Sequence, residues 1–115
     1  MFRMAQTACI FCQIAHGEIP ARFVHEDPEV VAFADINPQA PTHLVVIPRA
    51  HHANFSSTPP DLHGKVAAVA TKIAREAGLA RGFRVVVNEG PDAAQSVPHL
   101  HYHVLGGRSL RWPPG

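Results

Sequence analysis

The chain has 115 residues, which suits one compact domain with a single core rather than two domains. Ten Lys and Arg residues against nine acidic ones give a net charge of +1, and the basic residues are scattered, so composition argues against binding to nucleic acid through a basic patch. No apolar stretch is long enough for a signal peptide or a membrane span. We therefore expect a cytoplasmic protein that binds neither nucleic acid nor membranes.

The first predicted element is a short helix over residues 11–16, which Gly17 ends. Cys9 and Cys12, the only two cysteines of the chain, lie at its start in the order Cys-Ile-Phe-Cys. This spacing favours a shared metal ion or a redox pair over a disulfide framework, and reduced thiols agree with a cytoplasmic location. A pair of reduced, buried cysteines without a ligand is the alternative.

Three strands are predicted next, over residues 23–26, 30–34 and 44–47, and the last is apolar on both faces. A long helix is predicted over residues 58–77, with Thr58 as its N-cap and Gly78 after its end. Val66, Val69 and Ile73 recur at three- and four-residue steps, so one face of this helix should pack on a sheet.

A fourth strand over residues 83–87, a loop over 88–98 and a final strand containing the histidines complete the chain. Five strands with one long and one short helix, and no alternation of strand and helix, predict an α+β fold with an antiparallel sheet. The whole chain, residues 1–115, is expected to form one domain.

Three histidines stand at alternate positions in the final strand: His99, His101 and His103. Side chains alternate between the faces of a strand, so the three imidazoles should share one face while Leu100 and Tyr102 join the core on the other. Imidazoles hold and transfer protons near neutral pH. The alternative is a solvated polar edge strand.

The loop before the histidines combines side-chain donors with small residues, over the run Asn88-Glu89-Gly90-Pro91-Asp92-Ala93-Ala94-Gln95-Ser96-Val97. Exposed backbone N–H groups and polar side chains of this kind can hold a phosphate. By itself such a loop is more often a plain turn, and its place directly before three histidines is what favours a binding role.

The histidine run matches the HxHxHxx signature, and the chain resembles the histidine triad (HIT) family in its nucleotide-binding branch. The resemblance extends to residues 35–43, 87–90, 95–97, 106–108 and 112–115. It implies a HIT fold and a homodimer with a continuous ten-stranded sheet. It also implies a flexible N-terminus over residues 1–8 and a tail over 108–115 that docks on the partner subunit.

The resemblance implies hydrolysis of purine nucleoside phosphoramidates, with release of AMP or GMP and no metal needed for the chemical step. His101 would attack the α-phosphorus and form a nucleotidyl-histidine intermediate, and neutral imidazole is a suitable nucleophile near pH 7. Hydrolysis of dinucleoside polyphosphates, nucleotidyl transfer and a non-catalytic nucleotide-binding module that docks on other proteins are the alternatives. The Trp-Pro-Pro-Gly ending argues against the first two.

The resemblance also implies roles for individual residues. His103 would hydrogen-bond the phosphate or the bridging atom, and Asp35 would bind the ribose hydroxyls. The other implied contacts are to the phosphate and leaving group (Asn88, Ser96), from the loop (Gln95, Val97), from the partner subunit (Trp112) and to the base (Phe11, Ile14, Ile19, Phe33). The last four could equally be core residues. Ala94 departs from the family's usual glycine, which puts the loop's approach to phosphate in doubt.

The cysteine pair resembles that of bacterial HIT proteins, which implies a structural zinc held by Cys9, Cys12, His51 and His99. His52 is the alternative to His51 as the fourth ligand. His51 is favoured because it stands third after Pro48, as the ligand of the family does after the same strand. As first histidine of the triad, His99 would otherwise act in catalysis as a proton carrier, and a bound zinc makes it structural. Replacing His101 should then abolish turnover, whereas replacing Cys9 or Cys12 should mainly lower stability.

Overall fold

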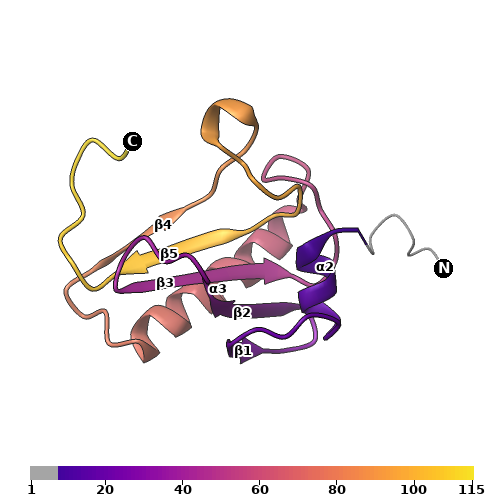
Figure 1. The fold of residues 1–115 in the computed structure, drawn as a ribbon, viewed down its shortest axis with the longest axis horizontal. Coiled ribbons are helices and arrows are strands. Elements are labelled where there is room, and N and C mark those ends of the chain that lie inside the picture. The colour runs from indigo at the N-terminus through magenta and orange to yellow at the C-terminus, as the bar shows by residue number, and fades with distance from the viewer. Residues whose placement is uncertain (1–7) are drawn as a thin grey trace.

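The computed structural model describes residues 8–115, so the expected flexible N-terminus lies, up to residue 7, outside the described residues. The elements are α2 (Ile10–Ala15), β1 (Phe23–Glu26), β2 (Val30–Ala34), β3 (Thr42–Pro48), α3 (Pro60–Glu76), β4 (Phe83–Val86), the short 3₁₀ helix η1 (Pro91–Ala93) and β5 (Tyr102–Gly106). The strands form one antiparallel sheet in the order β1-β2-β3-β5-β4 (Figure 1). This arrangement confirms the predicted α+β fold with one long and one short helix.

The long helix begins later than predicted, because Thr58 does not cap it. Pro59 occupies the N-cap position without a side-chain hydrogen bond, while the Thr58 hydroxyl donates to the Asn54 carbonyl at 2.8 Å in the preceding turn. The predicted C-terminal stop is confirmed, since Gly78 follows with a φ of 76°. Glycine adopts this left-handed conformation without the steric penalty of a side chain.

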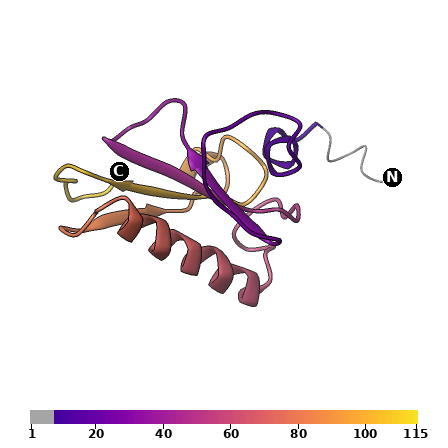
Figure 2. The same ribbon diagram turned by 90° about the horizontal axis from the view of Figure 1, so that it is seen from below.

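The sheet separates two apolar layers (Figure 2), and α3 covers one of its faces. On that face Val66, Val69 and Ile73 of the helix pack in one cluster with alternate residues of β2, β3 and β5, as the helical spacing predicted. The other face carries a smaller cluster that includes Ile14 and Ala15 of α2. Val45 and Ile47 of β3 belong to this smaller cluster, and the polar side chains of His43 and His103 lie on the same face of β3 and β5. Within the described residues, no helix is long and apolar enough to cross a bilayer.

Strand β5 starts at Tyr102, so only His103 of the three histidines lies inside a strand. His99 and His101 belong to the segment that leads into β5. The predicted alternation nevertheless holds across this boundary, because Leu100, Tyr102 and Val104 all join the cluster under α3. The histidines therefore face the opposite side, toward α2.

Candidate functional site

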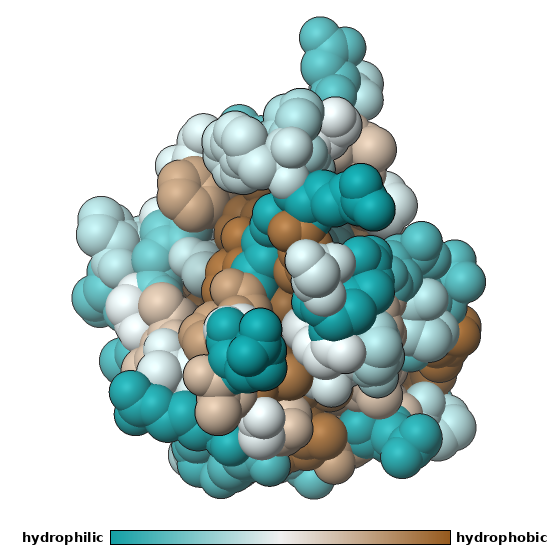
Figure 3. All heavy atoms as spheres, turned by 90° about the vertical axis from the view of Figure 1, so that its left-hand side faces the viewer, coloured by the Kyte–Doolittle hydropathy of each residue, from teal (hydrophilic) through white to brown (hydrophobic). Residues whose placement is uncertain are grey.

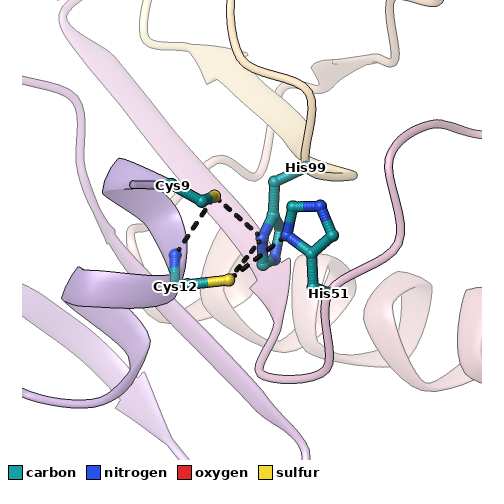
Figure 4. Close-up of side chains that lie close together, drawn as sticks. All are labelled: Cys9, Cys12, His51 and His99. Atoms are coloured by element: carbon teal, nitrogen blue, oxygen red, sulfur yellow. Dashed lines mark hydrogen bonds between the residues drawn. The ribbon is translucent and has the colours of Figure 1, made fainter. Parts of the chain in front are cut away.

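Two cysteines and two histidines from three separate segments meet beside α2 (Figure 4). Cys9 is the N-cap of α2 and Cys12 lies in its first turn, while His51 follows β3 and His99 precedes β5. The Nδ1 atom of His99 lies 3.4 Å from the Cys9 sulfur and 3.5 Å from the Cys12 sulfur. The Nδ1 atom of His51 lies 3.2 Å from the Cys12 sulfur.

These distances suit a tetrahedral zinc ion. Zinc–sulfur and zinc–nitrogen bonds of about 2.3 and 2.05 Å place sulfur and nitrogen ligands about 3.6 Å apart in a tetrahedron. The other ring nitrogen of His99 donates to the Pro48 carbonyl at 2.8 Å, which leaves the Nδ1 lone pair for the metal, the usual arrangement of zinc-bound imidazoles. Burial lowers the pKa of His99 to about 4 and so keeps the ring neutral. The residues present fit zinc, with His51 rather than His52 as the fourth ligand.

The middle histidine is held with one nitrogen unprotonated. His101 is buried, and its Nδ1 donates to the carbonyl of His99 at 2.8 Å. Burial also lowers its pKa, so the neutral ring carries its single proton on Nδ1. The Nε2 lone pair has no hydrogen-bond partner among residues 8–115, which gives His101 the electronic form that a nucleophile requires.

The third histidine belongs to a second polar cluster with Asp35 and His43. His103 and His43 lie on adjacent strands of the same sheet face, since β5 pairs Leu105 with His43 and His103 with Val45. The Nε2 atom of His43 lies 2.9 Å from Nδ1 of His103 and 3.3 Å from the Asp35 carboxylate. Burial lowers the pKa of His103 to about 4, so this ring is also neutral at pH 7.

The four apolar residues assigned to the base lie together on the α2 face of the sheet. Ile14 and Phe33 are buried, whereas Phe11 and Ile19 are partly exposed at the edge of the same cluster. The ring of Phe11 meets the ring of His101 edge-on, with centroids 5.0 Å apart. Buried Ile14 and Phe33 serve as core residues, and the partly exposed pair is the part of this cluster that a ligand can reach.

The loop before the triad is braced by Gln95. Its side-chain oxygen accepts from the Gly90 N–H at 3.0 Å, and its amide nitrogen donates to the carbonyls of Ala53 and Val97. Ser96 is exposed and Asn88 half-buried, and neither side chain is hydrogen-bonded within residues 8–115. These two polar side chains are therefore available to a ligand, whereas the Gln95 side chain is already engaged.

Ala94, which replaces the glycine usual in the family, lies at a position where the backbone conformation favours glycine. Ala94 has a φ of 61° and is the single non-glycine residue with positive φ between residues 8 and 115. It closes the turn of η1 through a hydrogen bond from its N–H to the Pro91 carbonyl. The loop therefore keeps its turn with alanine in the left-handed conformation, at a steric cost of about 1–2 kcal/mol.

Sequence reasoning did not select His43, although it lies against His103. The predicted third strand began at Leu44, whereas β3 begins at Thr42. Extending that strand by two residues places His43, Val45 and Ile47 on one face, which is a signal the sequence contained. Trp112 is 81 % exposed, and its expected contact with a partner subunit stays a prediction.

An antiparallel sheet that presents an HxHxH segment on the face opposite its long helix, beside a Cys₂His₂ metal site, defines a protein of the histidine triad class. The chain belongs to the HIT family, since the model of the HIT domain matches residues 16–110. A 14 kDa zinc-binding protein from Zea mays is 44% identical over 118 residues, covering 98% of this chain and 92% of the relative. The adenylylsulfatase HINT1 of Arabidopsis thaliana is 42% identical over 111 residues, covering 92% and 76%.

Solved structures agree with this assignment. A HIT family hydrolase from Legionella pneumophila Philadelphia 1 superposes with a TM-score of 0.90 at 47% identity, covering 93% of this chain and 99% of that one. A zinc-bound histidine triad protein from Mycobacterium smegmatis gives 0.81 at 37% identity, covering 89% and 76%. One of these relatives is named a zinc-binding protein and another was solved with zinc, which agrees with the fit of the four ligand atoms of this chain to a zinc ion.

Proposed function

We propose that this chain hydrolyses purine nucleoside phosphoramidates through a nucleotidyl-histidine intermediate. The observation that carries the proposal is the tautomer of His101. Its Nδ1–H donates to the His99 carbonyl, which leaves the Nε2 lone pair without a hydrogen-bond partner among residues 8–115. Relatives that are named hydrolases, including an adenylylsulfatase, support a reaction at a nucleoside monophosphoryl group. The leaving group of the natural substrate is the finer part of the proposal.

The reaction proceeds in two displacements at the same phosphorus. His101 Nε2 forms a bond to the α-phosphorus while the bond from phosphorus to the amine nitrogen breaks, and the departing amine takes up a proton from solvent. The ring keeps its Nδ1 proton and is cationic in the intermediate. Water then attacks the phosphorus, the phosphorus–imidazole bond breaks, AMP or GMP leaves, one proton of the water returns to solvent, and the ring is restored to its neutral form. His103, Asn88 and Ser96 supply hydrogen bonds to the phosphate and the leaving group, where negative charge develops.

Zinc holds the fold rather than the substrate in this proposal. When bound, the metal cross-links α2 to the segment before β5, because Cys9 and Cys12 belong to the first and His99 to the second. His99 is then a zinc ligand through Nδ1, and its carbonyl orients His101. The chain's own contribution to the chemistry comes from His101 and His103.

In a homodimer, Trp112 of the partner subunit would complete the site. Strand β4 lies at the edge of the sheet, and its residues Phe83 and Val85 are each 41% exposed, which suits continuation of the sheet into a second copy. Hydrophobic residues also lie in a hollow at the end where the tail leaves β5 (Figure 3). Light scattering on a sizing column is expected to give twice the chain mass.

Adenosine 5'-phosphoramidate tests the proposal directly. Wild-type protein is expected to release AMP, and His101→Ala should lose at least about four orders of magnitude in kcat, as removal of a nucleophile does elsewhere. His16→Ala, which changes an exposed histidine at the end of α2, is the matched control. Mass spectrometry of quenched wild-type protein should show the AMP adduct. Binding of AMP without turnover or adduct would leave only the non-catalytic module.

Parallel assays with adenylyl sulfate and diadenosine polyphosphates decide the leaving group. We expect the phosphoramidate to have the highest kcat/KM of the three. A higher value for either of the others would move the specificity to that substrate, while leaving the role of His101 unchanged.

A further inference from the structure

The cluster of Asp35, His43 and His103 has two possible functions. Its three ligand atoms lie within 4.8 Å of one another, a spacing that a transition-metal ion could bridge. Nε2 of His43 is also hydrogen-bonded to Nδ1 of His103, and the Asp35 carboxylate lies 3.3 Å from the same Nε2 atom. The position of each proton decides between these functions.

The backbone N–H of Gln39 fixes the first proton. It donates to Nδ1 of His43 at 3.0 Å, so this nitrogen is an acceptor and carries no proton. The neutral His43 ring must then carry its proton on Nε2. That atom lies 2.9 Å from Nδ1 of His103. Two N–H groups cannot face each other at this distance, so Nδ1 of His103 is an acceptor and its proton lies on Nε2.

A metal ion at this cluster would require the opposite arrangement. A histidine that binds a metal through Nε2 donates its Nδ1–H to a carbonyl or carboxylate. Nδ1 of His43 faces an N–H group instead, and moving the proton there would place two donors against each other. The Cys₂His₂ site shows the contrast, because the free nitrogen of His99 faces the Pro48 carbonyl.

We propose that His43 is a positioning residue that fixes His103 as the tautomer with its proton on Nε2. The three histidines of the HxHxH segment are then oriented by different groups. Main-chain carbonyls hold His99 and His101, whereas a side chain holds His103. His103 is therefore the one whose tautomer a single substitution can change.

The functional consequence rests on the proposed function, in which His103 contacts the phosphate or the leaving group. With the proton on Nε2, His103 offers an N–H donor to the oxyanion or the departing nitrogen. With the proton on Nδ1, the same ring would present a lone pair to a negatively charged phosphate. His43 thus selects the form of His103 that stabilises the transition state.

Three substitutions of His43 separate this role from simple packing. His43→Gln retains an amide N–H near the position of Nε2, whereas His43→Asn retains a polar group only near the position of Nδ1, within reach of the Gln39 N–H. His43→Phe keeps a ring and removes both nitrogens. We expect Gln to keep most of kcat and Asn and Phe to lose about 10- to 100-fold, with KM nearly unchanged.

Imidazole ¹⁵N NMR of zinc-loaded protein without substrate reads the tautomer itself. In wild type and His43→Gln, His103 is expected to show a protonated Nε2 and an unprotonated Nδ1, and in His43→Asn and His43→Phe a mixture of tautomers. A protonated Nδ1 in wild type, or an unchanged tautomer and kcat in both Asn and Phe variants, would overturn the proposal. If His43→Phe does not fold, His43→Asn still decides, because it can satisfy the turn at Gln39.

The NMR measurement also separates this inference from the proposed function. Wild-type protein that shows the Nε2 tautomer but hydrolyses no phosphoramidate would refute the substrate and keep the role of His43. Titration with Co²⁺ adds a check on the cluster, since we expect one ion per chain, at the cysteines. A second ion that is lost in His43→Gln would make the cluster a metal site and overturn the assignment.

Discussion

We expect removal of zinc to lower the free energy of unfolding strongly and to have little effect on the reactivity of His101, the proposed nucleophile. A bound zinc ion would join Cys12 to His51, 39 residues away, and both to His99 beyond the long helix. A cross-link across a loop of this length restricts the unfolded chain by about 4 kcal/mol, by the loop-closure relation used for disulfides. The loop that reaches His99 adds a further amount of similar size. A typical domain has a total stability of only about 5–15 kcal/mol, so the zinc-free protein should be marginal.

Urea unfolding of zinc-loaded and chelated protein measures this effect, with metal content determined by mass spectrometry. Each loss of about 4 kcal/mol lowers the urea midpoint by about 2 M for a domain of this size, so chelation, which opens both loops, should lower the midpoint by more than about 2 M. His51→Asn is expected to reproduce much of the loss, and His52→Asn, the matched neighbour outside the site, should have little effect. Equal midpoints for zinc-loaded and verified zinc-free protein would refute the structural role of the metal. Equal loss of turnover in well-folded Cys9→Ser, Cys12→Ser and His101→Ala proteins would refute the division between structure and chemistry.

Two further substitutions test local conformation and charge. Ala94→Gly should stabilise the protein by about 0.5–1 kcal/mol, because relief of about 1–2 kcal/mol of left-handed strain exceeds the entropy cost of glycine; a lower melting temperature would contradict the strain at this position. The pKa of His103 is lowered to about 4 from 6.5, so between these values the unfolded chain binds a proton that the native protein does not. Stability therefore falls as the pH drops from 7 to 5, by at most about 2 kcal/mol from this group, because solvent screening of the half-buried ring reduces the effect. His103→Gln should reduce the measured fall by up to that amount, and an identical pH dependence in both proteins would show that His103 is not desolvated.

Patterns with a fixed period were predictable from the sequence. Strands β1 and β2 were predicted with their observed bounds, and the stripe of α3 packs as its spacing requires. The zinc ligands were found through the cysteine spacing and the resemblance to bacterial relatives, and the structure brings all four together.

Features that depend on which residues become neighbours in space were not predictable in this way. The Thr58 hydroxyl donates to the Asn54 carbonyl of the preceding turn. The Gln95 amide nitrogen donates to the carbonyls of Ala53 and Val97, which lie in two different loops. The contact of His43 with His103 depends on the register between β3 and β5. Composition and periodicity carry no information on register, so these hydrogen bonds required the fold.

Phe11 stands between the two cysteines of the zinc site in sequence, and its ring lies 5.0 Å from that of His101. The same turn of α2 thus positions two thiols for a metal ion and one aromatic ring beside His101, the proposed nucleophile. Oxidation of the thiols, or competition by another thiophilic metal, would move this ring even though no residue of the HxHxH segment had changed. Under the proposed function, in which Phe11 contacts the base, the supply of zinc would then change the affinity of the protein for the nucleoside.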